Sequence, residues 1–405
     1  MINNKVKNNK LTVLVFISNY LPGYKSGGPM RTISNMVEHL GDLFNFLIIT
    51  GDRDIKDTSQ YQNIKVNGWN KLDNYYVYYL SPEAQKYNTL KNILNNTNFD
   101  ILYLNSFFSF RFSILPILVS RLSSKHNKQI VLAPRGEFST GALKLKYFKK
   151  ILYIRTSSLF GLYEKAIFQA SSDFEKEYIM YNLGKKTIPT IMVAPDLLPG
   201  NSFINNKISE RKTIHDPLRL IFLSRISPMK NLEYALSILA KISIKIEFDI
   251  YGPIEDIIYW GKCQNIICNL PENINARYLG EVKHEFVRDT IGSYDLFFLP
   301  TAGENFGHVI FESLSAGTPV LISDTTPWRN LQESGVGWDI ALSNKIEFIN
   351  TIEKLSSYEK STYSLLRKNA IAYANTRIND SDVVKANKDL FDYAFTKNRT
   401  DSSSI

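Results

Sequence analysis

The stretch "YDLFFLPTAGENFGHVIFESLSAGTPVLIS", residues 294–323, contains the pattern of a strand, a helix and a second strand. An apolar run ends at Pro300, a polar loop leads to Gly307, a helical pattern follows, and "TPVLIS" closes the stretch. Short apolar strands that alternate with helices are typical of parallel sheets covered on both faces. The stretch also places two glutamates, Glu304 and Glu312, where the first strand gives way to the helix.

Runs of the same kind occur along the whole chain: "LTVLVFIS", "FNFLIIT", "DILYLNS", "QIVLAP" and "TIMVAP" in the first half, and "LRLIFLS", "IKIEFDIYG", "ARYLG", "YDLFFLP" and "TPVLIS" in the second. We therefore expect an α/β protein with two Rossmann-like, doubly wound parallel-sheet domains that face a cleft. The polar stretch 198–217 predicts a linker, which places the domains at 1–197 and 218–380. A last helix and a polar tail, at 381–405, could return to the first domain.

The chain has 405 residues and a formal charge of +9, which is concentrated in its first half. Residues 1–200 carry 25 basic and 14 acidic side chains (+11), and the remainder carries 23 and 25 (−2). Such a basic surface suits nucleic acid, an anionic membrane or phosphorylated substrates. The apolar run 114–119 is far shorter than the roughly 20 residues of a membrane span. With only Cys263 and Cys268, a disulfide framework is not expected. We expect a cytoplasmic protein, with a secretory signal at the N-terminus as the alternative.

Two cations follow the first strand of the second half. Open α/β sheets bind ligands at the carboxyl ends of their strands, and there "SRISPMKN" offers Arg225 and Lys230. A guanidinium fork and a compact ammonium charge suit a diphosphate; the alternative is a solvated loop paired with surface acids. Gly252 and Glu281 lie in the turns after the next two strands, which could flank a flat base.

The two glutamates flank a predicted anion site. Gly307 and the amides of His308 and Val309 begin a helix, whose unpaired N–H groups and dipole favour a phosphate. A carboxylate beside a phosphate is suited to sugar hydroxyls, so we predict that Glu304 contacts a transferred sugar and Glu312 holds the ribose of a nucleotide-sugar. The alternative is that Glu304 caps the helix and Glu312 is a surface charge.

Glycines follow the first strand of the first half. Gly27 and Gly28 precede a helix that Pro29 could start, and adjacent glycines allow a backbone to approach a ligand closely. A plain tight turn is the alternative.

A basic segment, "APRGEFSTGALKLKYFKKILYIR", follows a later strand of that half and presents Arg135 and Gly136 at the same edge. We expect its helical part to be amphipathic, and either to lie on a membrane surface or to pack on its own sheet with solvated lysines. The predicted apolar stripe is Leu143, Tyr147, Ile151 and Ile154, and the lysines are Lys144, Lys146, Lys149 and Lys150.

Taken together, these motifs resemble retaining glycosyltransferases of the GT-B fold, family 4, and more narrowly the bacterial enzymes that build polysaccharide, O-antigen and lipopolysaccharide chains. The resemblance covers almost the whole chain. It is carried by "ENFGHVIFE" followed by "SLSAGTPVLIS", and by "SRISPMKN", "GGPMR", "APRGEFSTGALKLKYFKK" and "TTPWRNLQESGVGWDI".

The resemblance implies roles for individual residues. Glu304, Arg225 and Lys230 would act on the donor sugar and its diphosphate, and Glu312 would bind the ribose. It also implies transfer with retention, no cofactor and no metal, and a saccharide or lipid-linked acceptor at the inner face of the cytoplasmic membrane. The remaining implied donor contacts are Gly307, His308, Val309, Gly27, Gly28 and Gly252, and the implied acceptor or sugar contacts are Arg135, Gly136 and Asn105. Asn105 and Arg135 stand where many relatives carry histidines.

Other functions remain as alternatives. A metal-dependent transferase would use Asp-x-Asp, a pattern that Asp52 and Asp54 match. A dinucleotide-dependent dehydrogenase would need G-x-G-x-x-G, which the first loop lacks. A nucleotide-sugar epimerase would share both fold and site. A non-catalytic nucleic-acid or membrane-binding module would explain the basic first half but not the paired glutamates; we expect no nucleic-acid partner.

Overall fold

The structure is a computed structural model that describes residues 10–122, 128–144, 146–184, 190–200, 216–378 and 380–403. It divides into two compact units, one formed by Met1–Gly200 with Asp380–Ile405 and the other by Asn201–Asn379. Most of the predicted linker 198–217 lies outside the described residues. Each unit is an α/β fold built on a sheet of parallel strands, which confirms the predicted fold class.

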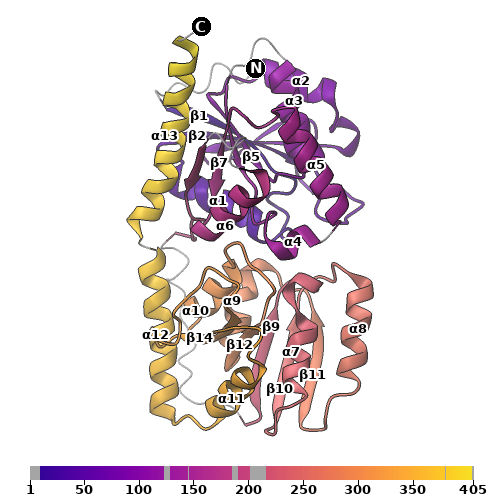
Figure 1. Cartoon of the computed structure of the whole chain (residues 1–405), viewed down its shortest axis with the longest axis vertical. Coiled ribbons are helices and arrows are strands. Elements are labelled where there is room, and N and C mark those ends of the chain that lie inside the picture. The colour runs from indigo at the N-terminus through magenta and orange to yellow at the C-terminus, as the bar shows by residue number, and fades with distance from the viewer. Residues whose placement is uncertain are drawn as a thin grey trace. The chain divides into compact units, whose positions relative to one another are not determined.

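The first unit has an eight-stranded sheet with the order β3-β4-β2-β1-β5-β6-β7-β8. Its strands β1, β2, β5 and β7 are labelled in Figure 1. Every neighbouring pair is parallel except β3 and β4, which form an antiparallel edge. Its strands are Leu11–Phe16 (β1), Phe44–Gly51 (β2), Trp69–Leu72 (β3), Tyr75–Leu80 (β4), Ile101–Asn105 (β5), Gln129–Ala133 (β6), Ala166–Ala170 (β7) and Thr190–Val193 (β8). Its helices are Gly28–Leu40 (α1), Tyr87–Asn96 (α2), Leu115–Leu122 (α3), Thr140–Lys144 (α4), Tyr147–Leu159 (α5), Asp173–Leu183 (α6) and Ser381–Ser403 (α13).

Both faces of this sheet are buried, because successive side chains of a strand point to opposite faces. Leu14 and Phe16 of β1 belong to a core that includes residues of α2, α3, α5 and α6. Val13 and Val15 belong to the other core, to which α1 and α13 contribute. The last helix of the chain therefore completes the first unit, where Phe391 packs on the sheet. Its backbone is helical as far as Ser403, through the stretch expected to be a polar tail.

The second unit has a six-stranded sheet with the order β11-β10-β9-β12-β13-β14, in which every neighbouring pair is parallel. β12 and β13 consist entirely of buried residues, as continuous apolar runs predict. Its strands are Leu218–Leu223 (β9), Ile246–Tyr251 (β10), Ile274–Gly280 (β11), Leu296–Leu299 (β12), Val320–Ser323 (β13) and Gly337–Ile340 (β14). Its helices are Leu232–Leu239 (α7), Ile257–Ile267 (α8), His284–Gly292 (α9), His308–Ser315 (α10), Lys345–Ser356 (α11) and Lys360–Ile378 (α12).

The basic helix expected after β6 differs from the prediction. The chain forms two helices, α4 and α5, and Lys146 between them has a left-handed backbone (φ 60°), which interrupts the helical path. The break rotates α5 relative to the predicted stripe. Leu143 and Ile154 are buried, but Tyr147 is exposed, so a single apolar stripe through all four positions was wrong.

Candidate functional site

The topology of the second sheet indicates where a ligand would bind. The chain passes from β9 to β10 and β11 on one side, then returns so that β12 pairs with the other side of β9. Connections that leave two neighbouring strands in opposite directions open a crevice at the carboxyl ends of those strands. The loops after β9 and β12 flank this point, and they carry "SRISPMKN" and "TAGENFG".

Lys230 and Glu304 meet at this point. The Lys230 ammonium lies 2.5 Å from Oε1 of Glu304, and the two side chains are only 10% and 11% exposed. The side-chain amide of Asn231 donates to the carbonyl of Pro300 at 3.0 Å, which ties the same two loops together. The structure thus places a cation and a carboxylate side by side at the edge where α/β sheets bind ligands.

Helix α10 begins beside Glu304. Gly307 precedes it in a left-handed conformation (φ 84°), and a Cβ on this residue would lie 2.8 Å from Cδ1 of Ile310. The first turn of the helix contains His308 and Val309, and the N-terminus of a helix favours an anion. The ring of His308 is buried and packs 4.8 Å from that of Phe306. His308 is therefore a packed side chain at the first position of α10.

Glu312 lies within α10 and is only 2% exposed. Its Oε1 is 3.8 Å from Nε2 of His284, the first residue of α9. Glu312 is therefore directed towards the loop after β11, whereas Glu304 contacts the loop after β9. The alternative in which Glu304 caps the helix and Glu312 is a surface charge is wrong, because Gly307 is the N-cap of α10 and Glu312 is buried.

Arg225 and Gly252 lie in the loops after β9 and β10. The Arg225 guanidinium donates to Oε1 of Glu255 at 2.9 Å, and these side chains are 42% and 45% exposed. Gly252 has φ 129°, and a Cβ there would lie 1.9 Å from the carbonyl oxygen of Ser224. Gly252 thus permits the loops after β9 and β10 to approach each other. Arg225 thus fits the alternative of a solvated loop cation paired with a surface acid, whereas Lys230 is buried, and diphosphate binding by Arg225 stays a prediction.

In the first unit, Gly27 and Gly28 lie where α1 begins. Gly27 is its N-cap, with φ 66°, Gly28 is its first residue, and Pro29 occupies the first turn. A Cβ on Gly27 would meet no atom within 4 Å, so packing does not require this glycine. Its left-handed backbone and open surroundings fit the approach of a ligand.

The remaining predicted contacts form a buried network at the carboxyl edge of the first sheet. Arg135, which follows β6, has a left-handed backbone (φ 56°) and a buried guanidinium. It donates to Oδ1 of Asn105 at 2.9 and 3.1 Å, to the Tyr103 hydroxyl at 2.5 Å, and to Asp196. Asp196 also accepts a hydrogen bond from Thr32 of α1 at 3.0 Å. Asn105 and Arg135 thus bind each other and interior groups, and the sugar contacts expected of them stay a prediction.

Two buried glutamates hold the backbone of the same edge. Glu175 accepts from the amides of Gly136 and Ser171, at 2.5 and 2.7 Å. Burial raises the pKa of Glu175 above its ordinary value, although these amides and the Arg135 charge oppose the shift. Glu137 accepts from the amides of Phe107 and Phe108 after β5, and burial raises its pKa too. Sequence reasoning missed the roles of both glutamates and of Asp196, although Asp196 follows the apolar run "TIMVAP" and so lay at the searched edge.

The Asp-x-Asp carboxylates make contacts within the first unit. Asp54 accepts from the amides of Tyr24 and Lys25 at 2.7 and 3.0 Å, and Asp52 pairs with Arg53. Among the residues that the structure describes, no group of three or more His, Cys, Asp or Glu side chains is arranged to hold a metal ion. Within the same residues, no helix has the length and apolar character needed to cross a membrane.

Comparison with known protein families gives a match that lies within the second unit. Residues 204–376 match the model of the family "Glycosyl transferases group 1". This match covers almost all of the second unit, Asn201–Asn379. The chain is also 20% identical to an uncharacterized 41.2 kDa protein in the cps region of Klebsiella pneumoniae, over 72% of this chain and 78% of that protein. It is 27% identical to the uncharacterized glycosyltransferase MJ1607 of Methanocaldococcus jannaschii, over 29% of this chain and 30% of that protein.

Solved structures share the fold of the whole chain. Sucrose-phosphate synthase from Thermosynechococcus elongatus aligns with 96% of this chain and 100% of its own, at 14% identity and a TM-score of 0.69. Anabaena HepE in complex with UDP and glucose aligns with 95% of this chain and 99% of its own, at 15% identity and a TM-score of 0.67. WaaG, a glycosyltransferase involved in lipopolysaccharide biosynthesis, aligns with 93% of this chain and 98% of its own, at 13% identity and a TM-score of 0.63. These similarities confirm the predicted GT-B fold, and with the family match they support a group 1 glycosyltransferase.

Proposed function

We propose that this protein is a retaining, metal-independent glycosyltransferase that moves a sugar from a nucleotide-diphosphate donor to a saccharide acceptor. The observation that carries the proposal is the contact between Lys230 and Glu304 at the carboxyl edge of β9 and β12, beside the start of α10. Cation, carboxylate and helix start together match a ligand that joins a diphosphate to a sugar. The match of this unit to the group 1 family supports the same assignment.

Each group has a distinct part in the proposed reaction. Lys230, Arg225 and the first amides of α10 bind the diphosphate and stabilise the charge that develops on it as it leaves. The bond between the sugar C1 and the phosphate oxygen breaks, and the acceptor oxygen bonds to C1 on the same face. The proton of the acceptor hydroxyl passes to the leaving phosphate oxygen, so no protein base is required. Glu304 accepts hydrogen bonds from the transferred sugar, and Glu312 from the ribose.

We further propose a role in bacterial surface polysaccharide synthesis, with a lipid-linked saccharide as acceptor. Two proteins with the same fold or a related sequence support this context: WaaG is involved in lipopolysaccharide biosynthesis, and the K. pneumoniae relative lies in a cps region. The donor base is proposed to be uracil, because HepE was solved with UDP and with UDP-glucose. HepE is similar to this chain in fold, so the identity of the base is tested directly.

The test is thermal unfolding of the whole protein in EDTA with UDP, GDP, ADP, CMP and their common sugar conjugates. A ligand at 100 times its dissociation constant stabilises the folded state by about 2.7 kcal/mol, which raises the melting temperature by several degrees. We expect a shift with one nucleotide, and a loss of affinity of about tenfold or more in Glu312→Gln, because a hydrogen bond to a charged group contributes about 1.5–3 kcal/mol.

Glu333→Gln, which removes an exposed carboxylate from the same unit, is the matched control and should bind as the wild type does. Conversion of the identified donor is then followed by NMR, in which a product that keeps the donor's anomeric configuration supports retention. Binding of no nucleotide, or equal binding by the wild type and Glu312→Gln, would contradict the donor site. Donor turnover to a changed sugar nucleotide, with no acceptor, would identify an epimerase instead.

A further inference from the structure

Helix α5 of the first unit exposes a row of large apolar side chains. Phe148, Leu152, Leu159 and the adjoining Phe160 are between 64% and 87% exposed. Phe148, Leu152 and Leu159 recur at intervals of four and seven residues, so they lie along one side of the helix. Ile154, on the other side, packs into the core of the unit. The apolar row is therefore the exposed side of a helix whose opposite side packs against the core of the unit.

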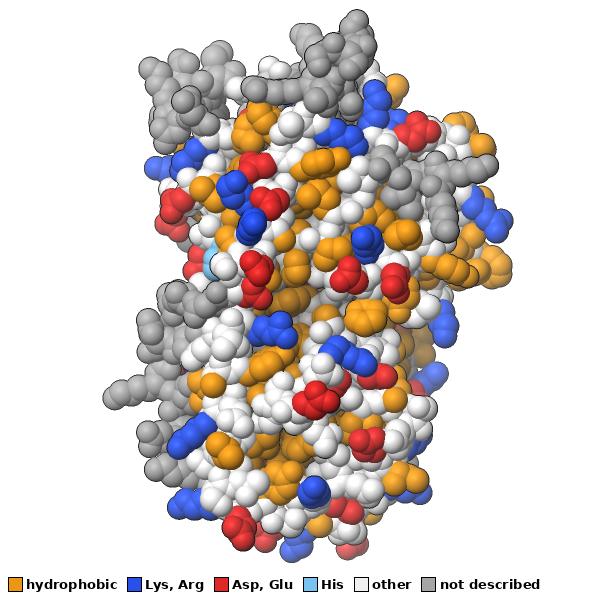
Figure 2. Space-filling model, turned by 60° about the vertical axis from the view of Figure 1, so that its left-hand side comes forward, with side chains coloured by type: hydrophobic (Ala, Val, Ile, Leu, Met, Phe, Trp, Pro, Cys, Tyr) orange, Lys and Arg blue, Asp and Glu red, His pale blue; other side chains and the backbone are white. Residues whose placement is uncertain are grey.

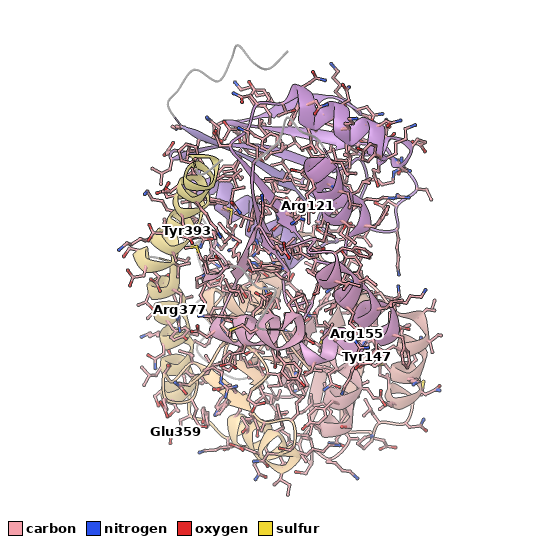
Figure 3. All side chains as sticks on the ribbon, turned by 45° about the horizontal axis from the view of Figure 1, so that its top comes forward. Arg121, Tyr147, Arg155, Glu359, Arg377 and Tyr393 are labelled. Atoms are coloured by element: carbon pink, nitrogen blue, oxygen red, sulfur yellow. The ribbon has the colours of Figure 1, made fainter. Side chains whose placement is uncertain are left out.

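The same segment carries charge of one sign. Residues 140–160 contain five basic side chains and no acidic one. Lys150 is engaged within the unit, where its ammonium donates to the carbonyl of Ala142 and lies over the ring of Phe108. Four basic side chains are exposed beside the apolar row: Lys144, Lys146, Lys149 and Arg155. We call this combination of apolar row and basic side chains the α5 surface; Arg155, which belongs to it, and Tyr147, the first residue of α5, are labelled in Figure 3.

This arrangement differs from ordinary surface. On the face of the molecule shown in Figure 2, basic and acidic side chains are interspersed among scattered apolar ones. Protein interfaces are depleted in lysine, whereas amphipathic helices on membranes combine Phe or Leu on one side with Lys and Arg. The lack of any carboxylate between residues 138 and 163 removes the repulsion that an anionic lipid surface would otherwise meet. Charge and apolar exposure together thus fit a membrane surface better than a second protein.

We propose that the α5 surface docks on an anionic lipid bilayer, with the apolar row inserted among the headgroups and the basic side chains bound to lipid phosphates. This proposal does not depend on the glycosyltransferase assignment, because it rests on the exposed side of one helix in the first unit. Each basic side chain near such a surface contributes about 1 kcal/mol, which corresponds to about fivefold in affinity.

The test is co-sedimentation of the full-length protein, without nucleotide, with sucrose-loaded vesicles of phosphatidylcholine alone or with 30% phosphatidylglycerol. We expect binding to the anionic vesicles, weakened by salt, and little binding to phosphatidylcholine. Lys149→Gln with Arg155→Gln should weaken binding about 25-fold, two factors of five. Phe148→Ser with Leu152→Ser should weaken it at least as much, because the inserted apolar area is lost.

Two exposed positions of the second unit provide matched controls, Lys368→Gln for charge and Ile346→Ser for apolar area. Both controls should bind as the wild type does, and all variants should keep the wild-type melting temperature because the substituted side chains are exposed. Failure of the wild type to bind anionic vesicles, or unchanged binding by both α5 variants, would overturn the proposal. A dimer of the wild type that the α5 variants abolish, without any vesicle binding, would instead make this face an interface between two copies.

Discussion

The contact between Lys230 and Glu304 has a measurable energetic consequence. Exposed ion pairs contribute about 0–1 kcal/mol, whereas removal of one partner of a buried pair costs about 3–5 kcal/mol because the other charge is left uncompensated. With side chains only 10% and 11% exposed, this pair is close to the buried limit. We therefore expect a coupling energy of about 2 kcal/mol in a double-mutant cycle of Lys230→Met and Glu304→Gln.

The pair of Arg225 and Glu255 serves as an internal reference, since it lies at the same sheet edge but is more than two-fifths exposed. Its coupling energy, measured with Arg225→Met and Glu255→Gln, should be below about 1 kcal/mol. Urea unfolding followed by tryptophan fluorescence suits both cycles. Three of the four tryptophans of the chain, Trp260, Trp328 and Trp338, belong to the second unit, so the signal reports mainly on the unit that carries both pairs.

A coupling energy for Lys230 and Glu304 below about 0.5 kcal/mol, or no larger than that of the exposed pair, would refute this reasoning. It would mean that water screens the two charges despite their burial, and the preorganised polar site on which the proposed function depends would lose its physical basis.

Three further outcomes are expected. Glu304→Gln should bind free nucleotide at least as tightly as the wild type but turn over more slowly, because the change frees Lys230 from a competing carboxylate while it weakens the sugar contact. A loss of nucleotide affinity of more than about tenfold, measured by calorimetry, would argue against this role of Glu304. Gly252→Ala should lower the free energy of unfolding by about 2 kcal/mol or more, since its Cβ would overlap the Ser224 carbonyl, while Gly261→Ala within α8, where nothing lies within 4 Å, should raise it by about 0.5–1 kcal/mol; equal effects of the two changes in urea unfolding would contradict the role of Gly252. Burial raises the folded-state pKa of Glu175 above its ordinary 4.5, so its contribution to stability is present below that value and is lost as the pH rises through the raised pKa. The free energy of unfolding of the wild type minus that of Glu175→Gln should therefore fall as the pH rises above 4.5, and a difference that rises would show the opposite shift.

The parallel sheets and the position of the candidate site could be predicted from the sequence because both depend on local patterns. Apolar runs such as "YDLFFLP" form buried strands in any context that covers both faces, and loops at their carboxyl ends are then fixed in place by topology. Lys230 and Glu304 were singled out for this reason. The edge strand β3 and its neighbour β4 were missed, and "YYVYYL" of β4 alternates little in polarity and resembles no buried run.

Contacts that join distant segments were not predictable in the same way. Arg135 and Asp196 are 61 residues apart, and nothing in either local sequence indicates that they share a buried network. The face of α5 was misassigned for a related reason: periodicity was counted through residue 146, where a left-handed backbone resets the helical phase. Patterns within one helix survive such a break, but the phase between two helices is set by tertiary packing.

The discontinuity of the first unit has a consequence for synthesis of the chain. Phe391 of α13 packs 5.4 Å from the rings of Phe44 and Tyr103, and Asn387 donates to the carbonyl of Pro195 at 2.8 Å. These partners leave the ribosome long before the helix that covers them, because all of residues 201–379 must be translated in between. One apolar face of the first sheet therefore lacks α13 during nearly half of translation. A nascent chain that stalls before residue 380 exposes this face to chaperones and proteases.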